Sequence, residues 1–274
     1  MTGLSSIAYK QQILNDFNNR SNYENEFHKR AATRLVELAK LQPGQHVLDI
    51  ATGTGLAAIA AAHIVGSTGC VLGTDFALGM LRQAQQKGKA LGLTNTKFEE
   101  VDADEQKLRE SQFDAILCSS AIVYLTDIPS SIRQWHSALK PGGVVAFSCL
   151  AETSPSASAL FREVVQRHGI TIPNPNELLG TPERCCRILE KIELKEISVT
   201  VEQLGFYLQD AETGWAGNAK SAFGIQNAKW SEEQLERCKH EYFAEVNKVS
   251  TEEGYWNDIT MFFVTARRSR TAST

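Results

Sequence analysis

The segment Asp49-Ile50-Ala51-Thr52-Gly53-Thr54-Gly55 decides how this chain of 274 residues folds. It ends a short apolar run, 46–50, and it precedes a segment of Ala, Leu and Ile, 56–64, that is typical of a helix packed on a sheet. Small residues at alternate positions let the backbone approach a ligand closely, and the following helix offers amide donors at its N-terminus. The segment therefore predicts a strand, a glycine turn and a helix that together form a ligand site.

Strands and helices alternate on both sides of this turn. The sequence predicts helices over 23–40, 79–92 and 132–139, strands over 46–50, 70–75, 96–101, 113–119 and 144–150, and a turn at Pro141-Gly142-Gly143. This spacing predicts an α/β fold, a mostly parallel sheet with helices on both faces. Such sheets bind ligands at the carboxyl ends of their strands.

The pattern changes after Leu150. A helix is predicted over 159–168, a sixth strand over 194–204 and a seventh over 259–266, and the long insertion between these last two strands is expected to carry substrate recognition. Within this insertion an aromatic stretch includes Tyr207 and Trp215. A packing cluster under a loop is one interpretation of these aromatics, and a pocket wall that makes both residues substrate contacts is the other.

Charge and composition favour a small-molecule partner. The 28 basic and 32 acidic residues give a net charge of −4 without any block of like charge, so neither a nucleic-acid groove nor a membrane surface is indicated. No apolar run is long enough to span a membrane, and the first residues do not resemble a secretory signal, so we expect a cytoplasmic protein. The six cysteines lack metal-ligand spacing, and we expect reduced thiols and no metal.

The glycine turn also fits a dinucleotide site. Gly53-Thr54-Gly55-Leu56-Ala57-Ala58 matches the G-x-G-x-x-A pattern, and Asp75 lies 75 − 55 = 20 residues beyond Gly55, so a nicotinamide-dependent oxidoreductase is one alternative. Against it, Asp49 would repel a pyrophosphate, and no second mononucleotide half follows the fifth strand. Asp49, Asp75 and Asp102 instead place three carboxylates along one edge, which suits a ligand with hydroxyls, amines and positive charge.

The order of motifs resembles the class I S-adenosylmethionine-dependent methyltransferases and is similar to the ubiquinone/menaquinone-type methylases. Five motifs carry the resemblance: 47–55, 73–76 with 79–81, 101–104, 113–118 and 139–143. It implies a Rossmann-like seven-stranded sheet with an antiparallel last strand and a helical cap insertion. It also implies a helical lid over 1–40, a cofactor-binding core over 41–150, a cap over 151–258 that includes the sixth strand, and a last strand and tail over 259–274.

The same resemblance implies how the methionine part of S-adenosylmethionine binds. Gly53 and Gly55 would shape the loop beneath it, and Asp49 would face its ammonium group. Ala51 departs from the family, because most relatives carry a glycine there, and we expect only a tighter fit. The carbonyl of Cys118 and its neighbour Ser119 would lie near the sulfonium.

The nucleoside part has its own set of implied contacts. Asp75 would accept hydrogen bonds from both ribose hydroxyls, for which a carboxylate is suited. Phe76 and Met80 would line the adenine. Asp102 would accept a hydrogen bond from the adenine amino group, and the amide of Ala103 would support the ring.

The expected activity is methyl transfer to a small molecule, slightly favouring oxygen over carbon or nitrogen, with S-adenosylmethionine as the cofactor. The sequence identifies no catalytic base, although Tyr9, Tyr23 and His28 are candidate lid residues, and Tyr23 and His28 are candidates for catalysis as well. Because no base can be named, a non-catalytic cofactor-binding module is a further alternative. The acceptor and the oligomeric state stay open.

Overall fold

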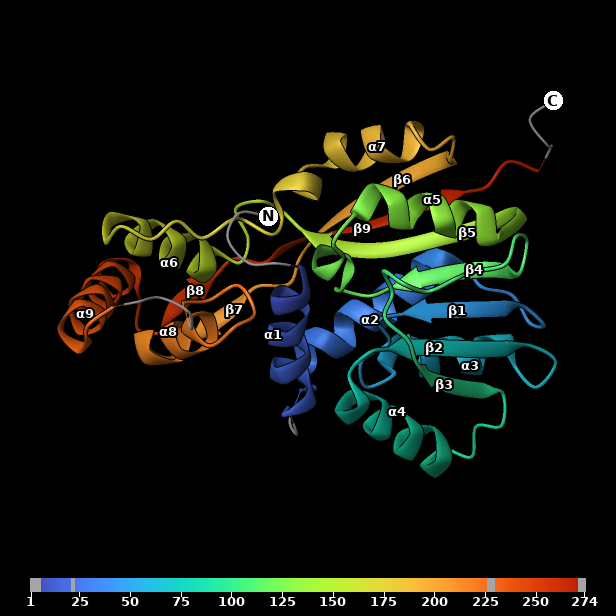
Figure 1. Cartoon of the computed structure of the whole chain (residues 1–274), viewed down its shortest axis with the longest axis horizontal. Coiled ribbons are helices and arrows are strands. Elements are labelled where there is room, and N and C mark those ends of the chain that lie inside the picture. Colours follow the sequence, from blue (N-terminus) through green and yellow to red (C-terminus); the bar gives the residue numbers. More distant parts are fainter. Residues whose placement is uncertain (1–5, 21–22, 226–229, 271–274) are drawn as a thin grey trace. The chain divides into compact units, whose positions relative to one another are not determined.

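The computed structural model describes residues 6–20, 23–225 and 230–270 (Figure 1). The chain divides into two compact units. The sheet unit comprises Ser6–Cys149, Thr181–Thr200 and Phe262–Thr274, and the helical unit comprises Leu150–Gly180 and Val201–Met261. Of the helices in the described ranges, none has the length and apolar character that crossing a membrane requires.

A seven-stranded sheet organises the molecule, with the strand order β3-β2-β1-β4-β5-β9-β6. The bounds of these strands are β1 His46–Ile50, β2 Cys70–Asp75, β3 Thr96–Glu100, β4 Phe113–Cys118, β5 Leu139–Leu150, β6 Lys195–Gln203 and β9 Thr260–Arg267. β1 is parallel to β2 and β4, β2 is parallel to β3, and β4 is parallel to β5. These pairings align the carboxyl ends of β1, β2 and β4 at one edge.

The last strand runs against its neighbours. Gly142 N–H donates to the Arg268 carbonyl, and Ala151 N–H donates to the Thr260 carbonyl. Residue numbers therefore fall along β9 in the direction in which they rise along β5. β9 therefore lies antiparallel between β5 and β6, which confirms the Rossmann-like sheet with an antiparallel last strand.

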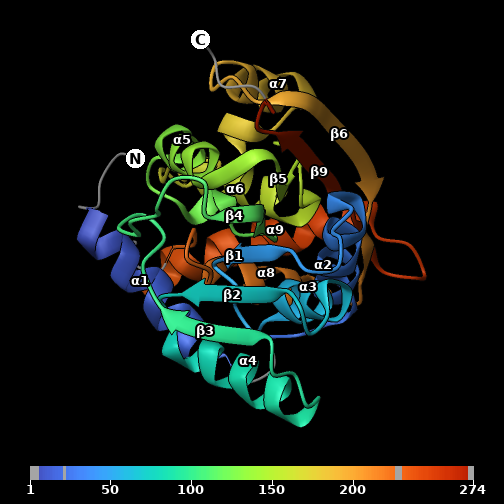
Figure 2. The ribbon, with the colours of Figure 1, turned by 90° about the vertical axis from the view of Figure 1, so that its right-hand side faces the viewer.

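Helices pack around this sheet because their sequences bury one face. The helices of the sheet unit are α1 Ser6–Asn18, α2 Glu26–Ala39, α3 Leu56–Val65, α4 Leu78–Ala90, α5 Ile128–Ala138 and α7 Pro182–Glu190, with a 3₁₀ turn, η1, at Ile122–Tyr124. α2 packs on α3, and α1 packs on α4 beside the β3 edge (Figure 2). Asn25 and Asp127 cap α2 and α5 through their side chains, which fixes where these helices begin.

One local prediction was wrong, and the bounds of one helix were not predicted. The expected turn at Pro141-Gly142-Gly143 lies inside β5, where the register jumps from Phe113 opposite Leu139 to Ala115 opposite Val144. The proline and glycines therefore form a bulge within the strand rather than a turn before it. The helix α1 lies within the expected helical lid, but its bounds were not predicted, although Tyr9, Ile13 and Phe17 follow one another at helical spacing.

The helical unit contains α6 Ser156–Arg167, the 3₁₀ turn η2 Glu177–Leu179, α8 Ala211–Ala219, α9 Glu232–Val249, and a two-stranded ribbon of β7 Phe206–Leu208 and β8 Tyr255–Asn257. Its core centres on Phe161, Trp215 and Tyr242, whose rings contact one another edge-on or tilted at centroid distances of 5.3 to 6.0 Å. The predicted cap over 151–258 does not match this unit, because 181–200, with α7 and most of β6, groups with the sheet unit.

Candidate functional site

The turn between β1 and α3 buries a carboxyl group that is only half satisfied. Asp49 is 1% exposed, and its Oδ2 accepts a hydrogen bond of 2.5 Å from the Thr52 hydroxyl. Its Oδ1 is buried and has no hydrogen-bond partner in the described part of the chain. Burial raises the pKa of Asp49 to about 7, although the Thr52 hydroxyl and the nearby Ala58 backbone N–H oppose this shift. An oxygen in this condition favours a ligand that carries a hydrogen-bond donor.

The backbone of this turn is left-handed at three positions. Ala51, Gly53 and Gly55 have φ values of 50°, 55° and 81°. A Cβ at Gly55 would lie 2.9 Å from the Cβ of Ala84, which explains a glycine there, whereas a Cβ at Gly53 would meet nothing within 4 Å. Glycine adopts this left-handed conformation more easily than alanine does. The alanine at position 51, where the resembling family carries a glycine, therefore costs free energy in the backbone, in addition to the tighter fit that the sequence predicts.

Asp75 joins the turn to the end of β2. Its Oδ2 accepts the Gly53 N–H and its Oδ1 accepts the Ala77 N–H, each at 2.8 Å. Burial raises the pKa of this carboxyl group, which is 7% exposed, and the backbone hydrogen bonds oppose the shift. A carboxylate has about four acceptor sites, so it can also accept ligand hydroxyls.

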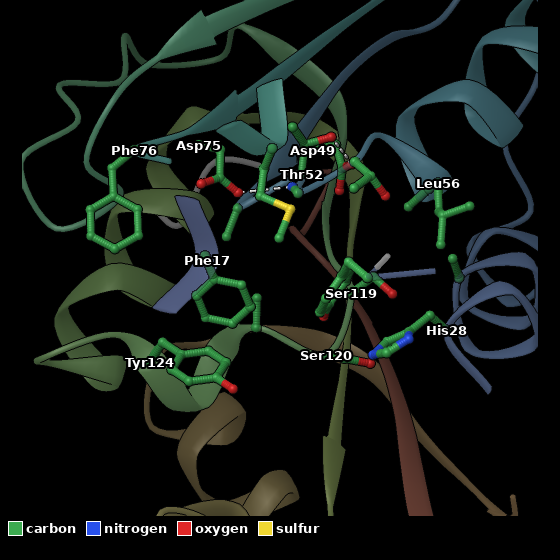
Figure 3. Close-up of a pocket in the computed structure, with 18 of the residues that line it drawn as sticks. Phe17, His28, Asp49, Thr52, Leu56, Asp75, Phe76, Ser119, Ser120 and Tyr124 are labelled. Carbon is green, nitrogen blue, oxygen red and sulfur yellow. Dashed lines mark hydrogen bonds between the residues drawn. The ribbon is translucent and has the colours of Figure 1, made fainter. Parts of the chain in front are cut away.

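A cavity of about 730 Å³, including its open mouth, lies over this turn (Figure 3). Seven of the predicted cofactor contacts line it: Asp49, Ala51, Gly53, Asp75, Phe76, Met80 and Ser119. The structure adds a wall that the sequence analysis did not predict, formed by Ile13 and Phe17 of α1, Leu56 of α3, and Ser120 and Tyr124 near η1. The helical spacing of Ile13 and Phe17 in α1 could have predicted part of this wall.

Two of the three candidate lid residues also line the cavity. Tyr23 and His28 stack at a ring-centroid distance of 4.2 Å, and Tyr23 contacts Phe17 edge-on at 5.8 Å. Tyr9 is not among the lining residues. Residues of α1 and α2, together with Tyr23, therefore form part of the cavity wall, and a lid over 1–40 remains a prediction.

Four predicted cofactor contacts are not in the cavity lining: Gly55, Asp102, Ala103 and Cys118. Asp102 instead binds Lys10 of α1, with Nζ to Oδ2 at 2.5 Å, and its Oδ1 accepts the Asp104 N–H. Cys118 is fully buried at the end of β4. Their cofactor roles remain predictions.

The two predicted substrate residues lie in the helical unit. Trp215 is 6% exposed within the apolar cluster, which favours the packing interpretation. Tyr207 is 38% exposed on β7 and packs edge-on against Trp256 of β8 at 5.1 Å. A substrate role for Tyr207 remains a prediction.

Comparison with known proteins identifies the family. A family model described as a methyltransferase domain matches residues 47–143. Aklanonic acid methyltransferase DauC of a Streptomyces species is 32% identical over 149 residues, which cover 53% of this chain and 68% of DauC. The chain belongs to the class I S-adenosylmethionine-dependent methyltransferases. These relatives are not nicotinamide-dependent oxidoreductases, so that alternative is dropped, and so is the non-catalytic module.

Other methyltransferases match over shorter parts of their length. The demethylmenaquinone methyltransferase of Geobacillus kaustophilus is 34% identical, over 44% of this chain and 51% of its own. The ubiquinone/menaquinone biosynthesis C-methyltransferase UbiE of Shewanella frigidimarina is 29% identical, over 61% of this chain and 64% of its own. The chain thus spans between half and two thirds of these two enzymes.

A solved methyltransferase shares the fold. Phosphoethanolamine N-methyltransferase 2 of Haemonchus contortus, in complex with phosphomonomethylethanolamine and S-adenosylhomocysteine, has a TM-score of 0.55 and 18% identity, and the match covers 96% of this chain and 57% of that one.

The cavity of this methyltransferase fits its cofactor, S-adenosylmethionine. The partnerless Asp49 Oδ1 can accept a hydrogen bond from an ammonium group, and the lone pairs of Asp75 can accept hydroxyls. Because Gly53 has no side chain, its backbone in the cavity wall stays accessible to a ligand. When bound, the cofactor would supply the methyl group from its sulfonium, and these residues would supply binding and position.

Proposed function

We propose that this methyltransferase holds the amino-acid part of S-adenosylmethionine at Asp49 and Gly53 and the ribose at Asp75. The partnerless Asp49 oxygen is the single observation that carries this arrangement, because a buried polar atom without a partner is costly unless a ligand satisfies it. Phe76 and Met80 follow Asp75 along the chain and line the same cavity, so they support the neighbouring adenine.

The acceptor in this proposal is a mostly apolar ring compound. Phe17 and Tyr124 lie together in the cavity, away from Asp49 (Figure 3), and their rings contact edge-on at 5.4 Å. Ile13 of α1 extends this apolar wall. The names of the relatives point to the same chemistry, since aklanonic acid and demethylmenaquinone are their stated substrates.

Carbon is the acceptor atom that we propose. The sequence preference for oxygen depended on no residue, whereas the UbiE relative is named a C-methyltransferase. A hydroxyl group on the ring raises the electron density of the neighbouring carbons and so makes them nucleophilic. Methyl transfer then needs an in-line approach and a site that excludes water, and the aromatic wall supports both requirements.

The position of the new methyl group tests this proposal. The enzyme is incubated with methyl-¹³C-labelled S-adenosylmethionine and 1,4-dihydroxynaphthalene, and the product is analysed by NMR. We expect a ring-methyl signal. A methoxy signal would instead establish oxygen as the acceptor, and product formed only with amine acceptors would overturn the acceptor class.

A further inference from the structure

Among the described residues that line the cavity, His28 carries a further buried polar atom without a hydrogen-bond partner, besides those of Asp49 and Thr54. It lies in the first turn of α2, where its backbone N–H donates a hydrogen bond to the side chain of the capping residue Asn25 at 3.0 Å. Its Nδ1 is buried and has no hydrogen-bond partner in the ranges that the structure describes. The His28 side chain lines the cavity, and the described residues offer this nitrogen no competing protein group.

The surroundings of the ring keep it in place and uncharged. Tyr23 stacks on it at 4.2 Å, and Phe27 contacts its edge at 5.3 Å. Burial, and then the positive charge of Arg20, lower the pKa of His28 to about 4, whereas Glu24 opposes this shift. A neutral imidazole has one N–H donor and one nitrogen that accepts a hydrogen bond or a proton.

His28 lies at the end of the cavity where the methyl group is expected. Figure 3 shows it on the same side as Ser119 and Ser120, at the carboxyl end of β4 and away from Phe76. The family resemblance places Ser119 near the sulfonium. An acceptor that reaches the methyl group therefore passes His28.

We propose that His28 is a catalytic residue that accepts the hydroxyl proton of the acceptor during methyl transfer, an inference that rests on the proposed function. As the bond between sulfur and the methyl carbon breaks, its electron pair stays on sulfur, and a ring carbon of the acceptor forms the new bond with its own π electrons. The hydroxyl becomes a protonated carbonyl and passes its proton to Nδ1. The hydrogen on the methylated carbon then moves to the oxygen, which restores the hydroxyl, and the imidazolium releases its proton to water.

The low basicity of His28 suits this step. A protonated carbonyl is far more acidic than an imidazolium, so even a weakly basic ring takes its proton. Before the reaction, the same nitrogen accepts a hydrogen bond from the hydroxyl and orients the ring.

Two variants separate this role from packing. His28→Phe keeps a ring against Tyr23 but removes the nitrogen, and His28→Asn keeps a hydrogen-bonding group of similar reach that cannot take a proton. We expect His28→Phe to lower kcat by about 10²- to 10⁴-fold, the usual range for acid–base catalysis. Its affinity for S-adenosylhomocysteine should stay within about threefold of the wild type, because ring packing is retained. His28→Asn should recover acceptor KM but not kcat.

Two outcomes would overturn the inference: turnover by His28→Phe close to the wild type, or a loss of cofactor affinity that matches the loss of turnover. If the wild-type enzyme methylates no hydroxylated ring, the proposed function fails instead. A measurement that needs no turnover then decides the role of His28. The ¹⁵N shifts of its ring are recorded with S-adenosylhomocysteine before and after 1,4-dihydroxynaphthalene is added. We expect the Nδ1 signal to move, and an unchanged signal would exclude the contact.

Discussion

At the scale of single residues, Asp49 links cofactor binding to pH. Its pKa of about 7 means that most molecules carry a protonated carboxyl group below that pH. The ammonium of S-adenosylhomocysteine favours the carboxylate, so binding releases a proton, and affinity should rise about tenfold between pH 6 and pH 8. Calorimetric titration at several pH values measures this rise, and Asp49→Asn should flatten it. If the affinity of the wild type does not change with pH, Asp49 does not contact the ammonium group.

The same group affects the ligand-free protein in the opposite direction. The folded state retains a proton between the ordinary carboxyl pKa and about 7, whereas the unfolded state has already lost it. The free energy of unfolding therefore falls as the pH rises through this window. Asp49→Asn, measured by urea denaturation, should reduce that fall.

Ala51 offers a second test at this scale. Its φ of 50° costs an alanine more than a glycine, so Ala51→Gly should leave the free energy of unfolding unchanged or raise it by up to about 1 kcal/mol. Ala58→Gly, inside the buried face of α3, is the matched control and should destabilise by at least about 1 kcal/mol. Destabilisation of equal size in both variants would refute the argument from backbone conformation.

At the scale of elements, one lysine of α1 lies between two carboxylates and helps to hold the helix. Lys10 Nζ lies 2.5 Å from Asp102 and 3.2 Å from Asp104, and Asp104 in turn accepts the Thr126 N–H beside η1. This network connects three segments at the cavity. Because the lysine side chain is only 23% exposed, the pairs are less screened than surface pairs.

Lys10→Met should loosen α1 over the cofactor cavity. We expect faster amide hydrogen exchange in α1 and a severalfold faster dissociation of S-adenosylhomocysteine in stopped-flow measurements. Lys97→Met is the control, because Lys97 pairs with Glu99 at an exposed position, and it should change neither. Unchanged exchange in Lys10→Met would show that other contacts hold the helix, such as its apolar packing and the hydrogen bond from Gly79 N–H to Asn18.

The elements around the glycine turn were predictable, and those in the second half less so. Strands β1, β2 and β4 carry short apolar runs, and α3 and α4 separate β1, β2 and β3 as the sequence predicts. Pro141-Gly142-Gly143 is typical of a turn, but the pairing of β5 with β4 and β9 keeps these residues in a strand. The Lys10 contact with Asp102 spans 92 positions, and no local pattern encodes it.

At the scale of the whole molecule, each unit has its own core. Trp215→Ala removes a large side chain from the cluster of the helical unit, and it should cost about 3 to 5 kcal/mol in stability. Binding of S-adenosylhomocysteine, whose predicted contacts lie in the sheet unit, should persist. Tyr207→Ala, at an exposed position, is the control and should cost less than about 1 kcal/mol. If Trp215→Ala keeps its stability but changes the KM for the acceptor, the substrate role of Trp215 is supported instead of the packing role.

The interrupted course of the chain constrains how the helical unit can be exchanged between relatives. The chain passes between the units at 149/150, 180/181, 200/201 and 261/262. A chimera that replaced 151–258 as one block would remove β6 and leave β9 without its outer neighbour. Recombination at all four junctions would replace the helical unit in two pieces and keep 181–200 with its own sheet.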